Sequence, residues 1–166
     1  FFALTESIVY QQLSGKAAGT IYGRFLTLFS TGHPTPKALL KLEDVAIRAT
    51  GISSQKLSYL KDLALKFEDK TINEKGLETW SDEEVRAHLI AVKGIGRWTS
   101  DMFLMFYLHR IDVLPTGYLG IQKGFMKLFK LRSMPTPEKM EKLAEGWRPY
   151  RTVTARYLWN IADEDK

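Results

Sequence analysis

Apolar residues recur at spacings of three and four along almost the whole chain, as in Leu57, Leu60, Ala64 and Phe67. Such spacings place side chains on one face of an α-helix, whereas the period-two alternation that is typical of strands is hard to find. The pattern therefore predicts an all-α fold. We expect helices at about residues 3–13, 16–30, 37–49, 54–68, 81–91, 97–109, 118–130, 137–146 and 149–162.

Three helix starts carry capping signals. Ser81 is followed three residues later by Glu84, which is the spacing of a capping box. Thr35-Pro36 and Thr136-Pro137 each place a hydroxyl before a proline, and proline suits the first turn of a helix because its missing N–H has no partner there. Helices are therefore expected to begin near residues 35, 81 and 136.

The chain has 166 residues, 45% of them hydrophobic, so it can form one compact core or two small helical lobes sharing a cleft. We expect one functional unit. Apolar runs such as Met102–Leu108 are far shorter than the roughly 20 residues that cross a bilayer, and no signal peptide pattern precedes them. A soluble protein without a membrane partner is expected. The abrupt apolar start, Phe1-Phe2-Ala3-Leu4, predicts a preceding segment that this sequence lacks, an N-terminal truncation.

The net charge of +5 favours a polyanionic partner, although solvated lysine faces give the same total, so charge alone does not decide the matter. Cysteine is absent and there are only three histidines, which argues against disulfides, iron–sulfur clusters and zinc sites built from side chains. An intracellular, reducing compartment suits this composition.

The most informative stretch runs from Glu84 to Leu108, where two amphipathic segments are broken by Val92-Lys93-Gly94-Ile95-Gly96. The glycines permit a tight turn and a close approach of the backbone to another group. A turn that opens into a new helix directs several amides and the positive end of the helix dipole at one spot, which suits a DNA phosphate. An ordinary helix–helix turn is the alternative, because a lone GxG is common.

The run LIAVKGIGRWTSDMFLMF resembles the hairpin of helix-hairpin-helix DNA glycosylases, and three further segments agree with that family in order. They are SIVYQQLSGKAAGTIYGRF, TGISSQKLSYLKDLA and WRPYRTVTARYLW. Because the resemblance covers nearly the whole chain, it decides against the ordinary turn. The chain looks like the DNA-3-methyladenine (alkylbase) glycosylases, which implies a single glycosylase domain over 1–166, with its hairpin at about 81–109 and two helical lobes around a DNA-binding cleft.

The resemblance implies that backbone amides at Gly94 and Gly96 bind a phosphate just 3′ of the damaged nucleotide. Lys93 and Arg97 could add phosphate contacts that weaken with salt, or as exposed basic residues be only solvated. No cofactor is required, but such hairpins often hold a structural Na⁺ or K⁺ on backbone carbonyls. Those carbonyls would belong to Ile90, Val92 and Ile95.

These enzymes take a base out of the stack, so they need a residue that fills the gap. Gln11, Gln12 and Leu13 match the family's gap-filling segment, and Gln12 is the first choice for the wedge. For Leu13 we favour packing in the core over a wedge role.

The extruded base needs a pocket, and helical geometry places Trp98, Asp101 and Met102 on one face of the helix that leaves the hairpin. Trp98 and Trp159 occupy family positions that line the pocket, where an aromatic face suits an electron-deficient alkylated base. The alternative for each is a core aromatic. Bifunctional relatives carry a nucleophilic lysine at the position of Trp98, so any glycosylase activity should be monofunctional and leave an abasic site.

The resemblance fails at one position. The family has a Pro-x-x-Asp-Leu-Gly segment whose aspartate faces the sugar, but here Tyr118 stands at the aspartate position between Pro115 and Gly120. Breaking the glycosidic bond develops positive charge on the sugar, and a neutral phenol supplies no counter-charge. Asp101 could substitute, although a salt bridge at the helix surface is the commoner fate of such a residue.

We therefore expect a DNA repair protein that binds duplex DNA containing alkylated bases or abasic sites, as a monomer in a bacterial cytoplasm or a eukaryotic nucleus. The main hypothesis is hydrolysis of the N-glycosidic bond of an alkylated purine without strand cleavage. The alternative is an impaired variant that binds damaged or abasic DNA. A generic module that tethers another activity to DNA would explain the hairpin but not Trp98 and Trp159.

Overall fold

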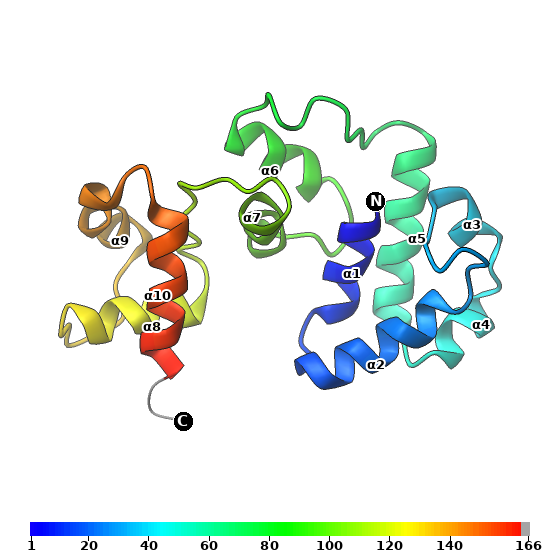
Figure 1. Cartoon of the computed structure of the whole chain (residues 1–166), viewed down its shortest axis with the longest axis horizontal. Coiled ribbons are helices and arrows are strands. Elements are labelled where there is room, and N and C mark those ends of the chain that lie inside the picture. Colours follow the sequence, from blue (N-terminus) through cyan, green and yellow to red (C-terminus); the bar gives the residue numbers. More distant parts are fainter. Residues whose placement is uncertain (164–166) are drawn as a thin grey trace. The chain divides into compact units, whose positions relative to one another are not determined.

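The computed structural model describes residues 1–163, and every regular element in this range is helical (Figure 1). The all-α prediction is confirmed. The elements are α1 (Phe2–Tyr10), α2 (Gly15–Leu26), α3 (Pro36–Lys41), α4 (Asp44–Ala49), α5 (Ser54–Glu68), α6 (Asp82–Ile90), α7 (Arg97–Phe106), α8 (Leu119–Leu128), α9 (Pro137–Leu143), the 3-10 turn η1 (Glu145–Trp147) and α10 (Arg151–Asp163). None of the described helices is long and apolar enough to cross a membrane.

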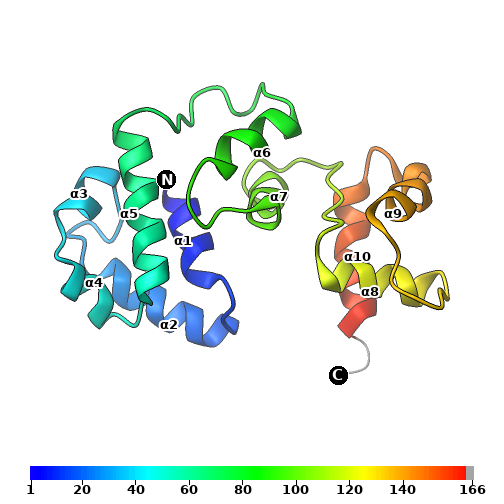
Figure 2. The same ribbon diagram turned by 180° about the vertical axis from the view of Figure 1, so that it is seen from behind.

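The chain divides into two compact units, residues 1–96 and the described residues from 97 onward. In the first unit α5 lies between α1 on one side and the short helices α3 and α4 on the other (Figures 1 and 2). Leu57, Leu60, Leu63 and Ala64 form the buried stripe of α5, which is the three-and-four spacing of the sequence. Burial of this stripe makes α5 the central helix of the unit.

The predicted capping signals are present. Ser81 and Glu84 form a reciprocal capping box at the start of α6. The hydroxyls of Thr35 and Thr136 accept hydrogen bonds from backbone amides in the first turns of α3 and α9, and a proline follows each. Local sequence therefore sets these boundaries, because each cap satisfies amides that have no partner within the helix.

The single helix expected over 37–49 is wrong. Leu42 and Glu43 are extended, with ψ values of 139° and 137°, and they separate α3 from α4. The Lys61 ammonium of α5 donates a hydrogen bond of 2.8 Å to the Leu42 carbonyl and pairs with Asp44 at 3.2 Å. This contact between distant residues stabilises the break, which the local pattern does not reveal.

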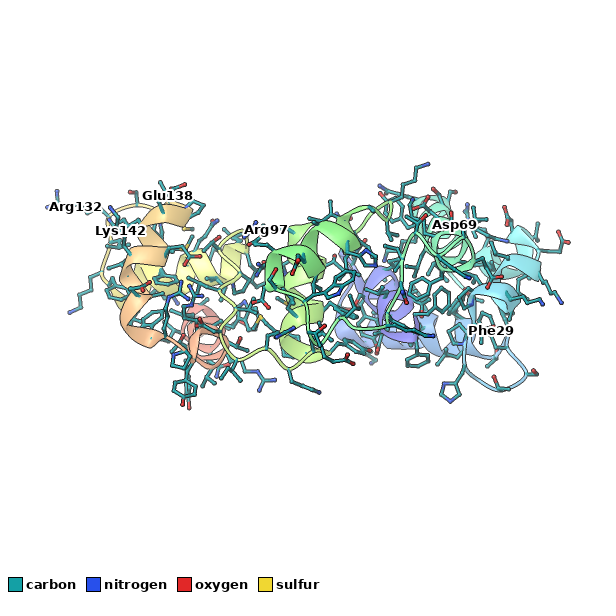
Figure 3. All side chains as sticks on the ribbon, turned by 90° about the horizontal axis from the view of Figure 1, so that it is seen from above. Phe29, Asp69, Arg97, Arg132, Glu138 and Lys142 are labelled. Carbon is teal, nitrogen blue, oxygen red and sulfur yellow. The ribbon has the colours of Figure 1, made fainter. Side chains whose placement is uncertain are left out.

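In the second unit α8 packs closely on α10. The close approach requires Gly124, because a Cβ there would collide with the backbone of Leu158. The segment 107–118 is tied to the start of α10, since Thr152 donates through its hydroxyl to the Arg110 carbonyl (2.7 Å) and accepts from the Val113 amide (2.9 Å). Near α9, the exposed side chains of Arg132 and Lys142 point away from the ribbon (Figure 3).

Candidate functional site

The turn after α1 presents exposed side chains. Gln11 ends the helix with extended backbone, and Gln12 adopts a left-handed conformation with φ of 56°, so α1 stops at Tyr10 instead of reaching residue 13. Leu13 is 40% exposed, so our preference for core packing at this residue is wrong. We call Gln11–Leu13 the gap-filling turn, after the role that the sequence predicts for it.

In the loop between α6 and α7 the branched apolar residues are buried and the residues beside them are exposed. Val92 and Ile95 are buried, whereas Lys93, Gly94 and Gly96 are exposed. The Val92 amide donates to the Leu89 carbonyl (3.0 Å), and the Ile95 amide donates to the Val92 carbonyl (3.1 Å). These contacts fix a compact turn, residues 91–96, which we call the hairpin turn.

The two glycines of the hairpin turn are under different structural constraints. Gly94 has φ of +78°, and a Cβ there would collide with the ring of Tyr59 from α5. Gly96 has no such constraint, because a Cβ there would meet no atom of the described residues within 4 Å. Internal packing thus explains Gly94 alone. The absent side chain at Gly96 keeps the backbone open to a group from outside.

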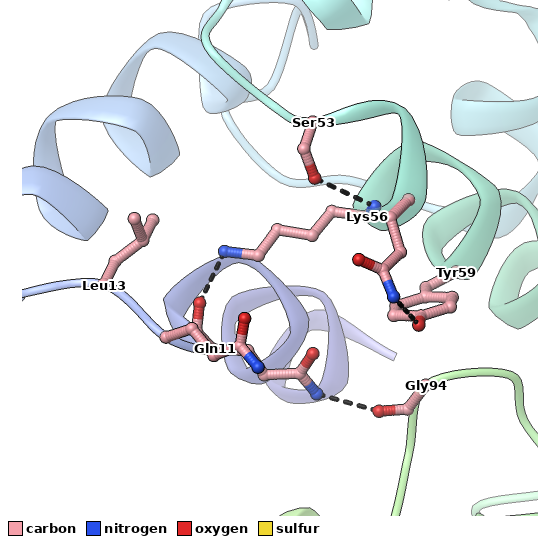
Figure 4. Close-up of a pocket in the computed structure, with 8 residues that line it drawn as sticks. Gln11, Leu13, Ser53, Lys56, Tyr59 and Gly94 are labelled. Carbon is pink, nitrogen blue, oxygen red and sulfur yellow. Dashed lines mark hydrogen bonds between the residues drawn. The ribbon is translucent and has the colours of Figure 1, made fainter.

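Hydrogen bonds link the gap-filling turn, the hairpin turn and α5. The Gln11 side-chain amide donates to the Gly94 carbonyl over 2.9 Å (Figure 4). The Lys56 ammonium donates to the carbonyls of Val9 (2.6 Å) and Gln11 (2.7 Å). A cavity of about 490 Å³ lies between these groups. Its lining consists of Gln11, Gln12, Leu13, Ser53, Gln55, Lys56, Tyr59 and Gly94.

Two charged groups of α5, Lys56 and Asp62, have pKa values that differ from their ordinary ones. Burial lowers the pKa of the Lys56 ammonium. Asp62 accepts hydrogen bonds from the Lys66 ammonium (2.6 Å) and the Lys93 backbone amide (2.8 Å). Burial alone would raise the pKa of Asp62, but these two bonds and the nearby positive charges hold it below its ordinary value.

The second unit contains a cluster of aromatic rings. Tyr118 stacks on Trp98 with ring centroids 6.0 Å apart and meets Trp159 edge to face at 5.6 Å. Phe106 stacks on the Trp159 ring at 6.4 Å. Trp98 and Tyr118 are 39% and 36% exposed, so the cluster opens to solvent. Gly120 gives the rings of Tyr118 and Trp159 room, because a Cβ there would lie about 3 Å from each.

Tyr118 is also the N-cap residue of α8. Its backbone is extended, as in most N-caps, but its side chain makes no capping hydrogen bond. Aspartate is among the best N-cap residues because its carboxylate accepts from the first amides of the helix and interacts favourably with the helix dipole. The backbone at position 118 therefore has the geometry of an aspartate cap, while the ring of Tyr118 lies among the tryptophans.

The other predicted pocket residues differ in exposure. Asp101 is only 2% exposed and Met102 is half-buried. The Trp159 indole N–H is buried and has no hydrogen-bond partner among the described residues. A buried donor without a partner is costly, and a group from outside the described residues that accepts from this N–H would remove the cost.

The structure groups most of the predicted residues in two places. Gln11, Gln12, Lys93 and Gly94 lie together in the first unit, and Trp98, Tyr118 and Trp159 lie together in the second. Sequence reasoning did not single out three residues of α5 that contact the turns, nor Phe106. The α5 residues belong to the matched segment TGISSQKLSYLKDLA, but nothing in that segment shows which carbonyls or amides they contact. They are Lys56, Tyr59 and Asp62.

Comparison with known proteins gives consistent matches along the chain. Residues 5–149 match the family described as HhH-GPD superfamily base excision DNA repair protein. The chain is 38% identical to DNA-3-methyladenine glycosylase 1 of Schizosaccharomyces pombe over 165 residues, which cover 96% of this chain and 71% of that protein.

Solved structures agree in fold. A 3-methyladenine DNA glycosylase of Schizosaccharomyces pombe in complex with abasic DNA superposes with a TM-score of 0.83 at 37% identity, covering 95% of this chain and 78% of that one. A DNA-3-methyladenine glycosidase of Bacillus halodurans superposes with a TM-score of 0.88 at 37% identity, covering 98% and 75% of the two chains.

Proposed function

Because this chain belongs to the HhH-GPD superfamily of base excision DNA repair proteins, we propose that it removes alkylated purines from duplex DNA by hydrolysing the N-glycosidic bond. The aromatic cluster around Trp98 and Trp159, within a chain that matches this superfamily, is the observation that carries the proposal. An electron-deficient alkylated base stacks well on such rings. The protein would remove these bases from genomic DNA, in a bacterial cytoplasm or a eukaryotic nucleus.

The hairpin turn binds the DNA backbone. The open backbone at Gly96 and the left-handed turn at Gly94 let a phosphate approach the amides closely, and Lys93 and Arg97 add positive charge. The carbonyls of Val92 and Ile95, which suit a structural Na⁺ or K⁺, belong to the same turn, and these two buried residues hold its shape. With Ile90, these residues would hold the cation. Such an ion would stiffen the turn and take no part in bond cleavage.

The gap-filling turn and the aromatic cluster serve the extruded base. Gln12 is exposed at the tip of its turn, so it can enter the space that the base leaves in the stack. Trp98 and Trp159 provide stacking surfaces, and an acceptor on the base would satisfy the buried indole N–H of Trp159. Because Trp98 replaces the lysine of bifunctional relatives, no Schiff base forms and the strand stays intact.

The bond-breaking step lacks one group at Tyr118. Loss of the base develops positive charge on the sugar, and removal of one preorganised electrostatic group commonly costs about a hundredfold to a thousandfold in rate. An alkylated purine already carries positive charge and leaves readily, so excision proceeds slowly without that group. Asp101, on the same helix as Trp98, is the carboxylate that could substitute for the missing group.

The test is base release from duplex DNA containing 3-methyladenine or 7-methylguanine, measured chromatographically for the wild-type chain and for Tyr118→Asp. Release by the wild type supports the proposal, and release only by Tyr118→Asp assigns the defect to Tyr118 within an otherwise competent site. If both forms bind abasic duplex but neither releases a base, the chain is a DNA-damage-binding protein and the hydrolase proposal is wrong.

A further inference from the structure

We propose that Lys56, Tyr59 and Asp62 of α5 are positioning residues that hold the gap-filling turn and the hairpin turn in a fixed relation to each other. The inference rests on the proposed function, in which the first turn enters the DNA stack while the second binds a phosphate. The three residues are spaced by three along α5, so they lie along one side of that helix.

Lys56 holds the gap-filling turn. The last carbonyls of a helix have no partner within it, and a lysine that binds them also complements the negative end of the helix dipole. Here the Lys56 ammonium binds the carbonyls of Val9 and Gln11 at 2.6 and 2.7 Å. These two bonds fix the point at which α1 ends, directly before the left-handed Gln12. The orientation of Gln12 therefore depends on Lys56.

Tyr59 and Asp62 hold the hairpin turn from the same side of α5. The Tyr59 ring packs against the face of Gly94 that lacks a side chain, and Gln55 donates a hydrogen bond of 2.6 Å to the Tyr59 hydroxyl. The Asp62 carboxylate accepts from the Lys93 amide at 2.8 Å. The Lys93 amide is therefore directed inward toward α5, and this bond fixes the hairpin turn to that helix.

The hydrogen bond from the Gln11 side chain to the Gly94 carbonyl links the two turns directly (Figure 4). Each turn is thus attached to α5 and to the other turn, all within the first unit. If Gln12 enters the gap in the base stack while the hairpin turn binds a phosphate, the distance between the two turns must be fixed. Displacements of about 1 Å in such a site lower the reaction rate strongly. Lys56, Tyr59 and Asp62 of α5 provide this fixed distance.

Lys56 is consequently a basic residue that does not act on DNA by its charge. Its ammonium is committed to two carbonyls, and burial lowers its pKa. Removal of a phosphate contact weakens binding to all duplexes alike and reduces the dependence of log K on log[salt] by about one. Removal of Lys56 should instead lower the preference for a duplex with a gap in the stack.

The experiment compares Lys56→Met with Lys61→Met as a matched control. Both changes remove one positive charge from α5 and the hydrogen bonding of an ammonium to backbone carbonyls. Lys56 binds two carbonyls of the gap-filling turn region, whereas Lys61 binds the Leu42 carbonyl and pairs with Asp44, away from the two turns. Affinities for an undamaged duplex and for a duplex with a stable abasic analogue are measured over a range of salt concentrations, and thermal unfolding is followed in parallel.

We expect Lys56→Met to lower the preference for abasic over undamaged duplex by about fivefold or more, with an unchanged salt slope, while Lys61→Met keeps the wild-type preference. Asp62→Ala should also lower the preference for the abasic duplex, although it changes the net charge in the opposite direction. If Lys56→Met does not fold, Asp62→Ala is the variant that tests the inference. In a Gln12→Ala background, Lys56→Met should have little further effect, because Lys56 acts through that turn.

Equal losses on both duplexes, or a salt slope reduced by about one in Lys56→Met, would make Lys56 a phosphate contact and overturn the inference. An unchanged preference in folded Lys56→Met and folded Asp62→Ala would overturn it as well. A wild-type chain without any preference for the abasic duplex would instead overturn the gap-filling role on which the inference rests, and the positioning role would fall with it. Base release tests the proposed hydrolase activity separately.

Discussion

At the scale of single residues, Tyr118 combines two properties that separate experiments can distinguish. It supplies no negative charge at the start of α8, and its ring fills space between Trp98 and Trp159. The first property affects the stabilisation of a developing sugar cation, and the second affects the room left for a base. A variant that restores charge and a variant that only reduces bulk therefore give different results.

Tyr118→Asp should raise the rate of alkylated-base release by at least about tenfold, because it adds a carboxylate beside the developing positive charge. Tyr118→Asn should not, because it removes the ring without adding charge, although both side chains cap a helix well. Single-turnover kinetics with excess protein measures the difference. Equal gains by the two variants would show that opening the space is sufficient.

Gly96 offers the cleaner test of the hairpin turn. A larger residue at Gly94 would disturb the left-handed backbone and the Tyr59 ring, whereas Gly96→Val meets open space and should leave the fold intact. We expect Gly96→Val to weaken duplex binding by about tenfold irrespective of sequence, because the phosphate can no longer reach the amides. Circular dichroism checks the fold. Unchanged affinity in folded Gly96 and Gly94 variants would remove the hairpin turn from the interface.

At the scale of elements, the segment between α7 and α8 depends on one carboxylate. Asp112 accepts hydrogen bonds from Arg151 at the start of α10 (2.6 Å) and from Arg148, which follows η1 (2.8 Å). Burial alone would raise the pKa of Asp112, but the Arg151 hydrogen bond and charge, with that of Arg148, leave it lowered. These contacts make Asp112 a support for the loop between α7 and α8.

A lowered pKa in the folded state means that Asp112 stabilises the fold above the pKa of an ordinary carboxyl group, near about 4, and that this contribution is lost as the pH falls through the lowered value. Asp112→Asn should therefore reduce the free energy of unfolding by about 1–3 kcal/mol at pH 7. Near pH 3 the two proteins should differ less. Urea denaturation at both pH values measures this, and a difference that grows on acidification would contradict the assigned ion pairs.

What could be predicted from the sequence follows the range of the interactions involved. Ser81, Thr35 and Thr136 were identified as caps because a cap bonds residues only three positions away. The break at Leu42 was missed because Lys61 stabilises it from a distant helix. For the same reason the contacts of Lys56 with α1 were not foreseen. Exposure of Leu13 also depends on where α1 ends, and a pattern of apolar spacing does not determine that.

At the scale of the whole molecule, the parts of the proposed function are distributed over both units. The first unit carries the gap-filling turn and the hairpin turn, and the second carries the aromatic cluster and Tyr118. The net charge of +5 favours association with DNA at low salt. Acting together, these parts should excise an alkylated base and leave the strand unbroken, since Trp98 stands where bifunctional relatives carry a nucleophilic lysine.

Strand analysis of a 5′-labelled duplex with a single 7-methylguanine distinguishes base excision from strand cleavage. After incubation with the wild-type chain or with Tyr118→Asp, half of each sample is treated with mild alkali, which breaks the strand at an abasic site, and both halves are separated by size. We expect a product at the 7-methylguanine position only after alkali, with more product from Tyr118→Asp. Breaks without alkali, or no product from either protein while both bind the duplex, would contradict this expectation.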